Sequence, residues 1–187
     1  MLKAVKICKK FGDNVILRDF THEFAVGATT AILGRSGVGK TTLLNILMGL
    51  LPPDSGEVIR EGKISALFQE DRLCENLTAG ANIRLVTGKR LSKERIAEEF
   101  TAAGLAGCEN KPARELSGGM KRRTAMLRAL LGEYDILFAD EPFKGLDEDT
   151  KRSVMNYFKE KTLGKTVVFI THDNEECELL ADDIIQL

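Results

Sequence analysis

The chain has 187 residues, 43% of them hydrophobic, which suits one folded domain with a sizeable core. Its 27 Lys and Arg residues nearly balance 28 Asp and Glu residues, so neither a basic field for nucleic acid nor an acidic tail is present. The four cysteines lie too far apart for a C-x-x-C pair, and there are only two histidines. This pattern predicts reduced thiols rather than a metal site.

The apolar segments give no sign of export or membrane insertion. Residues 1–6 alternate charged and apolar side chains and lack the continuous apolar stretch of a signal peptide. The longest apolar patch, at 43–51, is far shorter than the roughly 20 residues that span a bilayer. We therefore expect any membrane role to come through a partner.

Strand and helix signals alternate along the chain, as in a largely parallel sheet covered by helices. The predicted strands are 2–8, 15–24, 28–33, 64–68, 136–139 and 167–170. A helix is predicted at 41–50, ending before Pro52-Pro53. Helical spacing from Thr78 to Gly104 predicts a small helical subdomain inserted into the sheet domain.

Residues 34–41 fit the pattern G-x-x-x-x-G-K-[ST], which binds nucleotide phosphates. Glycines let backbone N–H groups curl around the phosphates. Lys40 would reach the β- and γ-phosphates, and Thr41 would offer its hydroxyl to Mg²⁺. The bare pattern also occurs by chance, but its place between a strand and a helix aims the helix dipole at the phosphates and favours the functional interpretation.

Two later strands deliver further polar groups to the same kind of position. Strand 136–139 runs into Asp140, which would lie near Mg²⁺, and Glu141, which can accept a proton from the attacking water. A positioned general base is worth about 10²- to 10⁴-fold in rate. Strand 167–170 is followed by His172, and ligands of α/β sheets bind at the carboxyl ends of strands.

Several of these pieces have simple structural explanations when each is taken alone. Ser117 before two glycines is typical of a helix N-cap, Gln69 of a polar strand end, Phe11 of a core or turn residue and His172 of a surface histidine. Residues 121–123, Lys-Arg-Arg, are typical of a solvated helix face. The order and spacing of all the pieces together favour function.

That order resembles the nucleotide-binding subunit of ABC transporters over nearly the whole chain. The resemblance implies an α/β P-loop NTPase fold with a mainly parallel sheet and a small antiparallel β subdomain. It implies a single domain over 1–187, with a helical subdomain at about 70–132. The ATP-contacting positions that it implies are Phe11, stacking on adenine, and Gly34, Arg35, Ser36, Gly37, Val38, Gly39, Lys40, Thr41 and Thr42.

The resemblance also implies a site shared between two subunits. Leu116 and the following four residues match the signature motif, in which Ser117, Gly118, Gly119 and Met120 would touch ATP held by the other subunit. Asp147 matches the D-loop. The implied catalytic residues are Glu141, His172 and Gln69, and the implied Mg²⁺ ligands are Thr41, Gln69 and Asp140.

Some positions depart from the family pattern. Met120 stands where glutamine is usual, so we expect weaker but not abolished ATP-dependent closure of the dimer. Lys144-Gly145 alters the approach to the D-loop. A regulatory C-terminal domain is not expected after Leu187.

The function implied is that of the ATP-binding and ATP-hydrolysing subunit of an ABC transporter. Such a subunit uses ATP and Mg²⁺ and pairs with a second copy or a second ATPase subunit. It binds an integral-membrane permease at the cytoplasmic face of the cell membrane and needs no nucleic acid. Residues 68–73, 140–143 and 171–182 look most like the nitrate/sulfonate/taurine importer branch, which implies an extracytoplasmic solute-binding protein and a small anionic or sulfonate-like cargo.

Two other classes of protein remain open at this point. A soluble ABC-type ATPase of DNA repair or translation usually carries a long coiled-coil insertion or two ATPase units, and this chain has neither. A non-catalytic nucleotide sensor would be expected to lack a catalytic residue, whereas Lys40, Asp140, Glu141 and His172 are all present.

Overall fold

The computed structural model describes residues 1–187, which divide into two compact units. The first unit comprises Met1–Ile64, Tyr134–Glu141 and Gly164–Leu187, and the second comprises Ser65–Glu133 and Pro142–Leu163. No helix in the chain combines the length and the apolar character needed to cross a bilayer.

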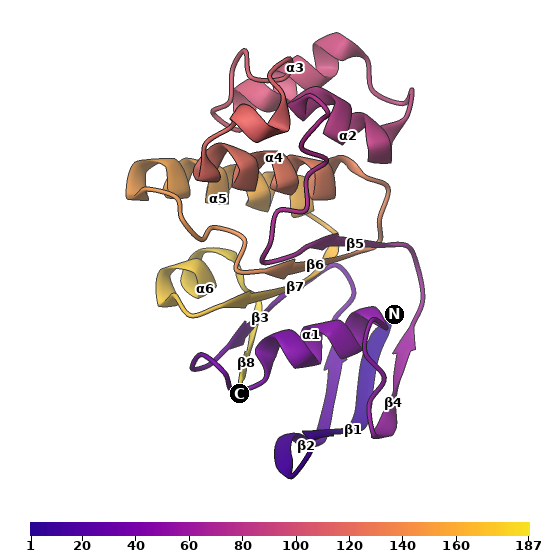
Figure 1. Ribbon diagram of the computed structural model, residues 1–187. Helices are drawn as coiled ribbons and strands as arrows, with labels where there is room; N and C mark the ends of the chain where they lie inside the picture. The colour runs from indigo at the N-terminus through magenta and orange to yellow at the C-terminus, as the bar shows by residue number, and fades with distance from the viewer. The chain divides into compact units, whose positions relative to one another are not determined.

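The first unit is built on a parallel sheet in the order β6-β7-β3-β8 (Figure 1). Its strands are β3 (Thr29–Leu33), β6 (Ile136–Asp140), β7 (Thr166–Thr171) and β8 (Asp183–Gln186). Strands β6 and β7 are buried along their whole length, which explains their continuous apolar character. Pairing sets Leu33 opposite Thr171 and Asp140 opposite Ile170. The chain therefore leaves β3, β6 and β7 at the same edge of the sheet.

A small antiparallel sheet in the order β2-β1-β4 also belongs to this unit. Its strands are β1 (Leu2–Phe11), β2 (Asn14–Phe24) and β4 (Ser55–Arg60). Strand β4 was not predicted, because its sequence holds only two apolar residues and starts at a Ser-Gly pair that reads as a turn. The predicted α/β class with a small antiparallel subdomain is confirmed.

Helices α1 (Lys40–Met48) and α6 (Asn174–Leu180) complete the first unit. Helix α1 ends earlier than the sequence predicts. Gly49 adopts the left-handed conformation with φ 76°, and its N–H bonds back to the carbonyl oxygen of Ile46. Glycine favours this cap because it has no Cβ. The stop signal is therefore Gly49 and not the following prolines.

The second unit is mainly helical. Its elements are α2 (Ala79–Thr87), α3 (Lys93–Ala102), the 3₁₀ turn η1 (Ala113–Glu115), α4 (Gly118–Leu131) and α5 (Glu148–Thr162), while β5 (Ile64–Leu67) begins at the last residue of the first unit. Gly88 ends α2, and the Ser92 hydroxyl caps α3 by accepting from the Arg95 N–H at 3.1 Å. The segment predicted as helical thus contains two helices with their own caps.

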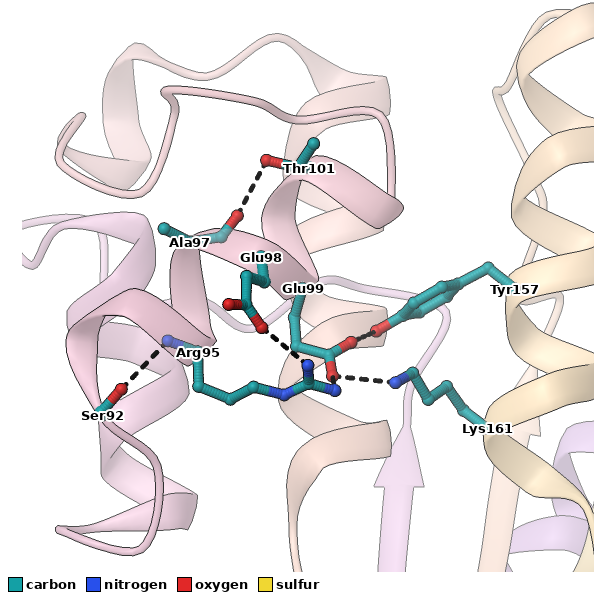
Figure 2. A network of polar contacts seen from close by, with 8 residues as sticks. All are labelled: Ser92, Arg95, Ala97, Glu98, Glu99, Thr101, Tyr157 and Lys161. Atoms are coloured by element: carbon teal, nitrogen blue, oxygen red, sulfur yellow. Dashed lines mark hydrogen bonds and ion pairs between the residues drawn. The ribbon is translucent and has the colours of Figure 1, made fainter.

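A buried carboxylate on α3 links this helix to α5 (Figure 2). Glu99 accepts from the Tyr157 hydroxyl at 2.5 Å and from Lys161 Nζ at 2.8 Å, and it pairs with Arg95 within α3. Burial by itself raises the pKa of Glu99, but the bonds from Lys161 and Tyr157 outweigh it and hold this pKa below its ordinary value. The carboxylate is therefore charged at neutral pH.

Replacing Tyr157 with phenylalanine tests the strength of this link. Tyr157→Phe removes a donor to a buried charge, so we expect the free energy of unfolding to fall by about 1.5–3 kcal/mol in urea titrations. Tyr134→Phe is the matched control, because the Tyr134 hydroxyl is buried without a hydrogen-bond partner. Removal of the Tyr134 hydroxyl should leave the free energy of unfolding unchanged or raise it. Equal losses in the two variants would contradict this account.

The same link predicts a pH dependence. A carboxyl whose pKa is lowered by folding stabilises the protein above its unfolded-state pKa, and this stabilisation is lost as pH falls through the folded-state pKa. For Glu99 the ordinary pKa is 4.5, so the loss begins below that pH. Unfolding midpoints measured across this range should fall less steeply for Glu99→Gln than for the parent chain.

Candidate functional site

The predicted phosphate-binding residues, 34–42, lie in the loop between β3 and α1 and in the first turn of α1. Arg35, Ser36 and Gly37 are exposed, and Lys40 begins α1. Gly39 has a φ of 115°, and a Cβ at this position would clash with Cγ2 of Ile16. Glycine is therefore required at Gly39 both by the backbone conformation and by the space available.

The Lys40 side chain folds back over this loop. It is 8% exposed, and Nζ donates to the carbonyl oxygens of Gly34 at 2.7 Å and Arg35 at 2.9 Å. The loop thus curls around an ammonium group at the N-terminus of α1, where the helix dipole also favours negative charge. A phosphate group is the ligand that this combination suits best.

Asp140 and Thr41 meet at the end of β6. The Thr41 hydroxyl donates to Asp140 Oδ2 at 2.9 Å, and Asp140 is only 4% exposed. One carboxylate beside one hydroxyl fits Mg²⁺, which is usually held by one or two carboxylates together with substrate phosphates. No cluster of three or more His, Cys, Asp or Glu side chains that could hold a metal occurs in residues 1–187. Phosphate oxygens of a bound nucleotide would supply further ligands for Mg²⁺ at the Thr41–Asp140 pair.

Glu141 occupies a strained backbone position directly after β6. Its φ is 47°, in the left-handed region that residues other than glycine rarely adopt. The Glu141 N–H donates to the carbonyl oxygen of Ile170 at 3.0 Å, which holds this conformation. Such strain clusters at functional sites because the surrounding structure must maintain it.

His172 lies beside Glu141. Its Nδ1 is 3.5 Å from Glu141 Oε1, and its side chain is 69% exposed. The turn that presents it is fixed by the preceding residue, because the buried Thr171 hydroxyl donates to Glu176 at 2.6 Å and accepts from the Asp173 N–H at 3.0 Å. A carboxylate and an imidazole therefore lie together at the sheet edge.

Phe11, at the end of β1, belongs to the same unit. Its side chain is 53% exposed, and Lys9 Nζ lies 5.6 Å from the ring centroid. An exposed phenylalanine is not a core residue, which leaves the ring available for stacking on a base.

The remaining predicted site residues, Gln69, Ser117 to Met120 and Asp147, lie in the second unit. Ser117 is the N-cap of α4, and its hydroxyl accepts from the Met120 N–H at 3.4 Å. Asp147 is likewise the N-cap of α5, accepting from the Thr150 N–H at 3.0 Å. That hydrogen bond lowers the pKa of Asp147. The structure thus confirms the capping explanation that the sequence suggested for Ser117 and adds a cap at Asp147 that it did not suggest, while Ser117 and Gly118 stay exposed at a helix N-terminus.

The signature segment and the D-loop segment adjoin within this unit. A Cβ at Gly119 would lie 3.5 Å from Leu146 Cδ2 and 3.7 Å from the carbonyl oxygen of Gly145. Two motifs that are far apart in the sequence thus form one surface.

Arg122 is the site-region residue that the sequence interpretation misjudged. A solvated helix face was the simple explanation for residues 121–123, yet Arg122 is 4% exposed and bonds to the backbone around Gln69. The run of three charged residues gave no indication that Arg122 is buried, because one turn of a helix can carry both solvated and buried side chains. The only signal in the sequence that could have indicated the burial of Arg122 is its position in helix α4.

Comparisons with known proteins all indicate one family, that of ABC transporter ATP-binding proteins. The family model described as ABC transporter matches residues 17–144. The aliphatic sulfonates import ATP-binding protein SsuB 1 of Rhodococcus jostii is 40% identical over 100% of this chain and 78% of its own length. The spermidine/putrescine import ATP-binding protein PotA of Acetivibrio thermocellus is 32% identical over 99% of this chain, which spans 58% of that protein.

Solved structures agree with these matches. A dimeric post-hydrolysis state of the ATP-binding cassette MJ0796, bound to ADP and Pi, superposes with a TM-score of 0.89 and 31% sequence identity. The match covers 100% of this chain and 94% of that one.

Proposed function

Because the chain belongs to the ABC transporter family and is an ATPase of that fold, we propose that it powers solute import through a separate integral-membrane permease. One observation carries the ATPase part of the proposal. The Lys40 loop, the Thr41–Asp140 pair at 2.9 Å and the Glu141–His172 pair at 3.5 Å all lie at the edge where β3, β6 and β7 end. Phosphate binding and hydrolysis need these groups in one place.

Each predicted site residue named below from the first unit has a role in this proposal. Lys40 exchanges its carbonyl contacts for phosphate oxygens, while Phe11 stacks on the adenine. Thr41 and Asp140 hold Mg²⁺, which neutralises charge on the phosphates when it is bound. Glu141 orients the attacking water and accepts its proton, and His172 donates to the charge that develops on the γ-phosphate.

The second unit supplies the surface that completes the site of a partner copy. Ser117 and Gly118 are exposed at the N-terminus of α4, where backbone N–H groups favour phosphate. In a dimer these groups bind the γ-phosphate of the ATP held by the other subunit. Gln69 takes part in hydrolysis in its own subunit, and hydrolysis releases the pair.

For the cargo we propose an aliphatic sulfonate or a similar small anion. The support is the 40% identity with the sulfonate import protein over the whole chain, against 32% with the polyamine import protein. A solute-binding protein outside the membrane completes the system and delivers the solute to the permease. The chain itself lies on the cytoplasmic face.

Affinity capture from native membranes tests the transport part. The tagged chain is bound to gently solubilised membranes, washed and analysed by mass spectrometry, with the tag alone as control. We expect a polytopic permease to be enriched with the chain, and ATP hydrolysis by that complex to rise with a sulfonate-loaded binding protein but not with spermidine. Capture of soluble partners only, by a chain that hydrolyses ATP, would point instead to a soluble ABC-type ATPase.

A further inference from the structure

Two arginines of α4 donate hydrogen bonds to backbone carbonyl oxygens of the loop that follows β5. Arg122 donates from Nη1 to the carbonyl oxygens of Phe68 at 2.6 Å and Gln69 at 3.4 Å. Arg128 donates to the carbonyl oxygens of Asp71 at 2.9 Å and Arg72 at 2.8 Å. The segment that contains Gln69 is thus bonded, at Phe68, Gln69, Asp71 and Arg72, to the helix that begins at the signature motif.

Arg122 also reaches a third segment. Its Nε donates to the carbonyl oxygen of Pro142 at 3.1 Å, and its Nη1 lies 3.3 Å from Asp71 Oδ1. Pro142 is covalently bonded to Glu141, the proposed general base. One guanidinium therefore joins α4, the Gln69 loop and the residue that follows the base.

The chemistry of arginine suits this connection. The side chain of Arg122 is 5% exposed, and a buried charge is tolerated only when it is hydrogen-bonded. Its planar fork presents donors in fixed directions, so acceptors on two segments are held at a set separation. Three of its acceptors are backbone carbonyls, so it fixes the course of the chain at Phe68, Gln69 and Pro142.

We propose that Arg122 is a positioning residue for ATP hydrolysis. It holds the backbone at Gln69 and next to Glu141 in a fixed relation to the helix that carries Ser117, so that movement of this helix on contact with a partner subunit reaches both segments. The inference rests on the proposed function, since it gives Gln69 and Glu141 their roles in hydrolysis. It adds a residue that touches neither nucleotide nor water.

The test compares Arg122→Gln and Arg122→Lys with the parent chain. We expect kcat for ATP hydrolysis to fall by about 10- to 100-fold in both, because small misplacements of catalytic groups have effects of this size. The Kd for ATP should stay at the parent value. Lysine keeps the charge, but its single ammonium group cannot occupy both the Nε position that bonds to Pro142 and the Nη1 position that bonds to Phe68. A residue needed only for its charge would be rescued by lysine.

Arg90→Lys is the matched control. Arg90 also donates to a backbone carbonyl of α4, that of Leu131 at the other end of the helix, at 2.5 Å. Its replacement should leave kcat unchanged. Thermal unfolding of each variant confirms that the folded protein is being assayed.

A double-mutant cycle with Gln69→Ala locates the effect. If Arg122 acts through the Gln69 loop, the double variant should lose little more kcat than the more damaging single variant. Parent-level kcat in the folded Arg122 variants, or failure of both Arg122 variants to fold, would overturn the inference. Losses that multiply in the double variant would overturn its Gln69 part. Parent-level turnover by Glu141→Gln would instead overturn the proposed function.

Discussion

Glu141→Gln should bind ATP as the parent chain does but hydrolyse it about 10²- to 10⁴-fold more slowly, the usual contribution of a positioned general base. Glutamine has nearly the same size and can still accept a hydrogen bond, but it cannot take a proton from water. Glu141 N–H keeps its bond to Ile170 in the variant, so the left-handed turn is preserved. Phosphate release and ATP titrations measure the two quantities separately.

A surface carboxylate of the same unit provides the control for this variant. Glu23 forms an exposed ion pair with Lys3 at 3.1 Å, and Glu23→Gln should leave turnover at the parent level. If Glu141→Gln also turned over at that level, another group would have to be the base. His172, at 3.5 Å from Glu141, would then be the next candidate.

Lys40→Ala should weaken ATP binding itself. We expect the Kd for ATP to rise by about 10- to 100-fold, because a hydrogen bond to a charged group is worth about 1.5–3 kcal/mol. The effect should persist without Mg²⁺, since the ammonium contacts the phosphates directly. Calorimetric titration with ATP, in the presence and absence of a chelator, measures it.

Lys3→Ala is the matched control for the lysine variant. It removes an ammonium from the same unit whose only partner is the exposed Glu23. ATP affinity should not change in Lys3→Ala. Tight ATP binding retained by Lys40→Ala would contradict the assignment of residues 34–42 to the phosphates.

The candidate site at the edge where β3, β6 and β7 end was predictable, because the sequence patterns that indicate it are local. A glycine-rich loop between a strand and a helix, and polar residues directly after buried strands, occupy fixed places in a parallel sheet. The pairing of Leu33 with Thr171 and of Asp140 with Ile170 then brings these residues to one edge. No long-range information beyond the alternation of elements was needed.

Other features depend on tertiary contacts that leave no local pattern. Strand β4 forms from a polar sequence because β1 provides it with a pairing partner. Burial of Arg122 depends on carbonyl oxygens at Phe68 and Pro142, which are far from it in the sequence. The left-handed backbone of Glu141 is likewise set by its neighbours, since glutamate has no preference for it.

Methionine at position 120, where glutamine is usual, leaves the N-cap of the signature helix in place. The Met120 N–H bonds to Ser117 Oγ, so the cap of α4 needs only the backbone at this position. Methionine at this position therefore leaves the helix N-terminus unaltered, and the effect that we expect is limited to a side-chain contact across the dimer. Weaker closure of the dimer remains our prediction.

Sedimentation velocity of Glu141→Gln tests the central claim most directly, because it asks whether ATP itself joins two copies across the proposed shared site. With ATP the variant should sediment as a dimer, and with ADP it should sediment as a monomer. Adding Ser117→Arg to the variant should abolish the ATP-dependent dimer by blocking the exposed N-terminus of α4. A variant that binds ATP tightly yet sediments identically with ATP and ADP would contradict the account.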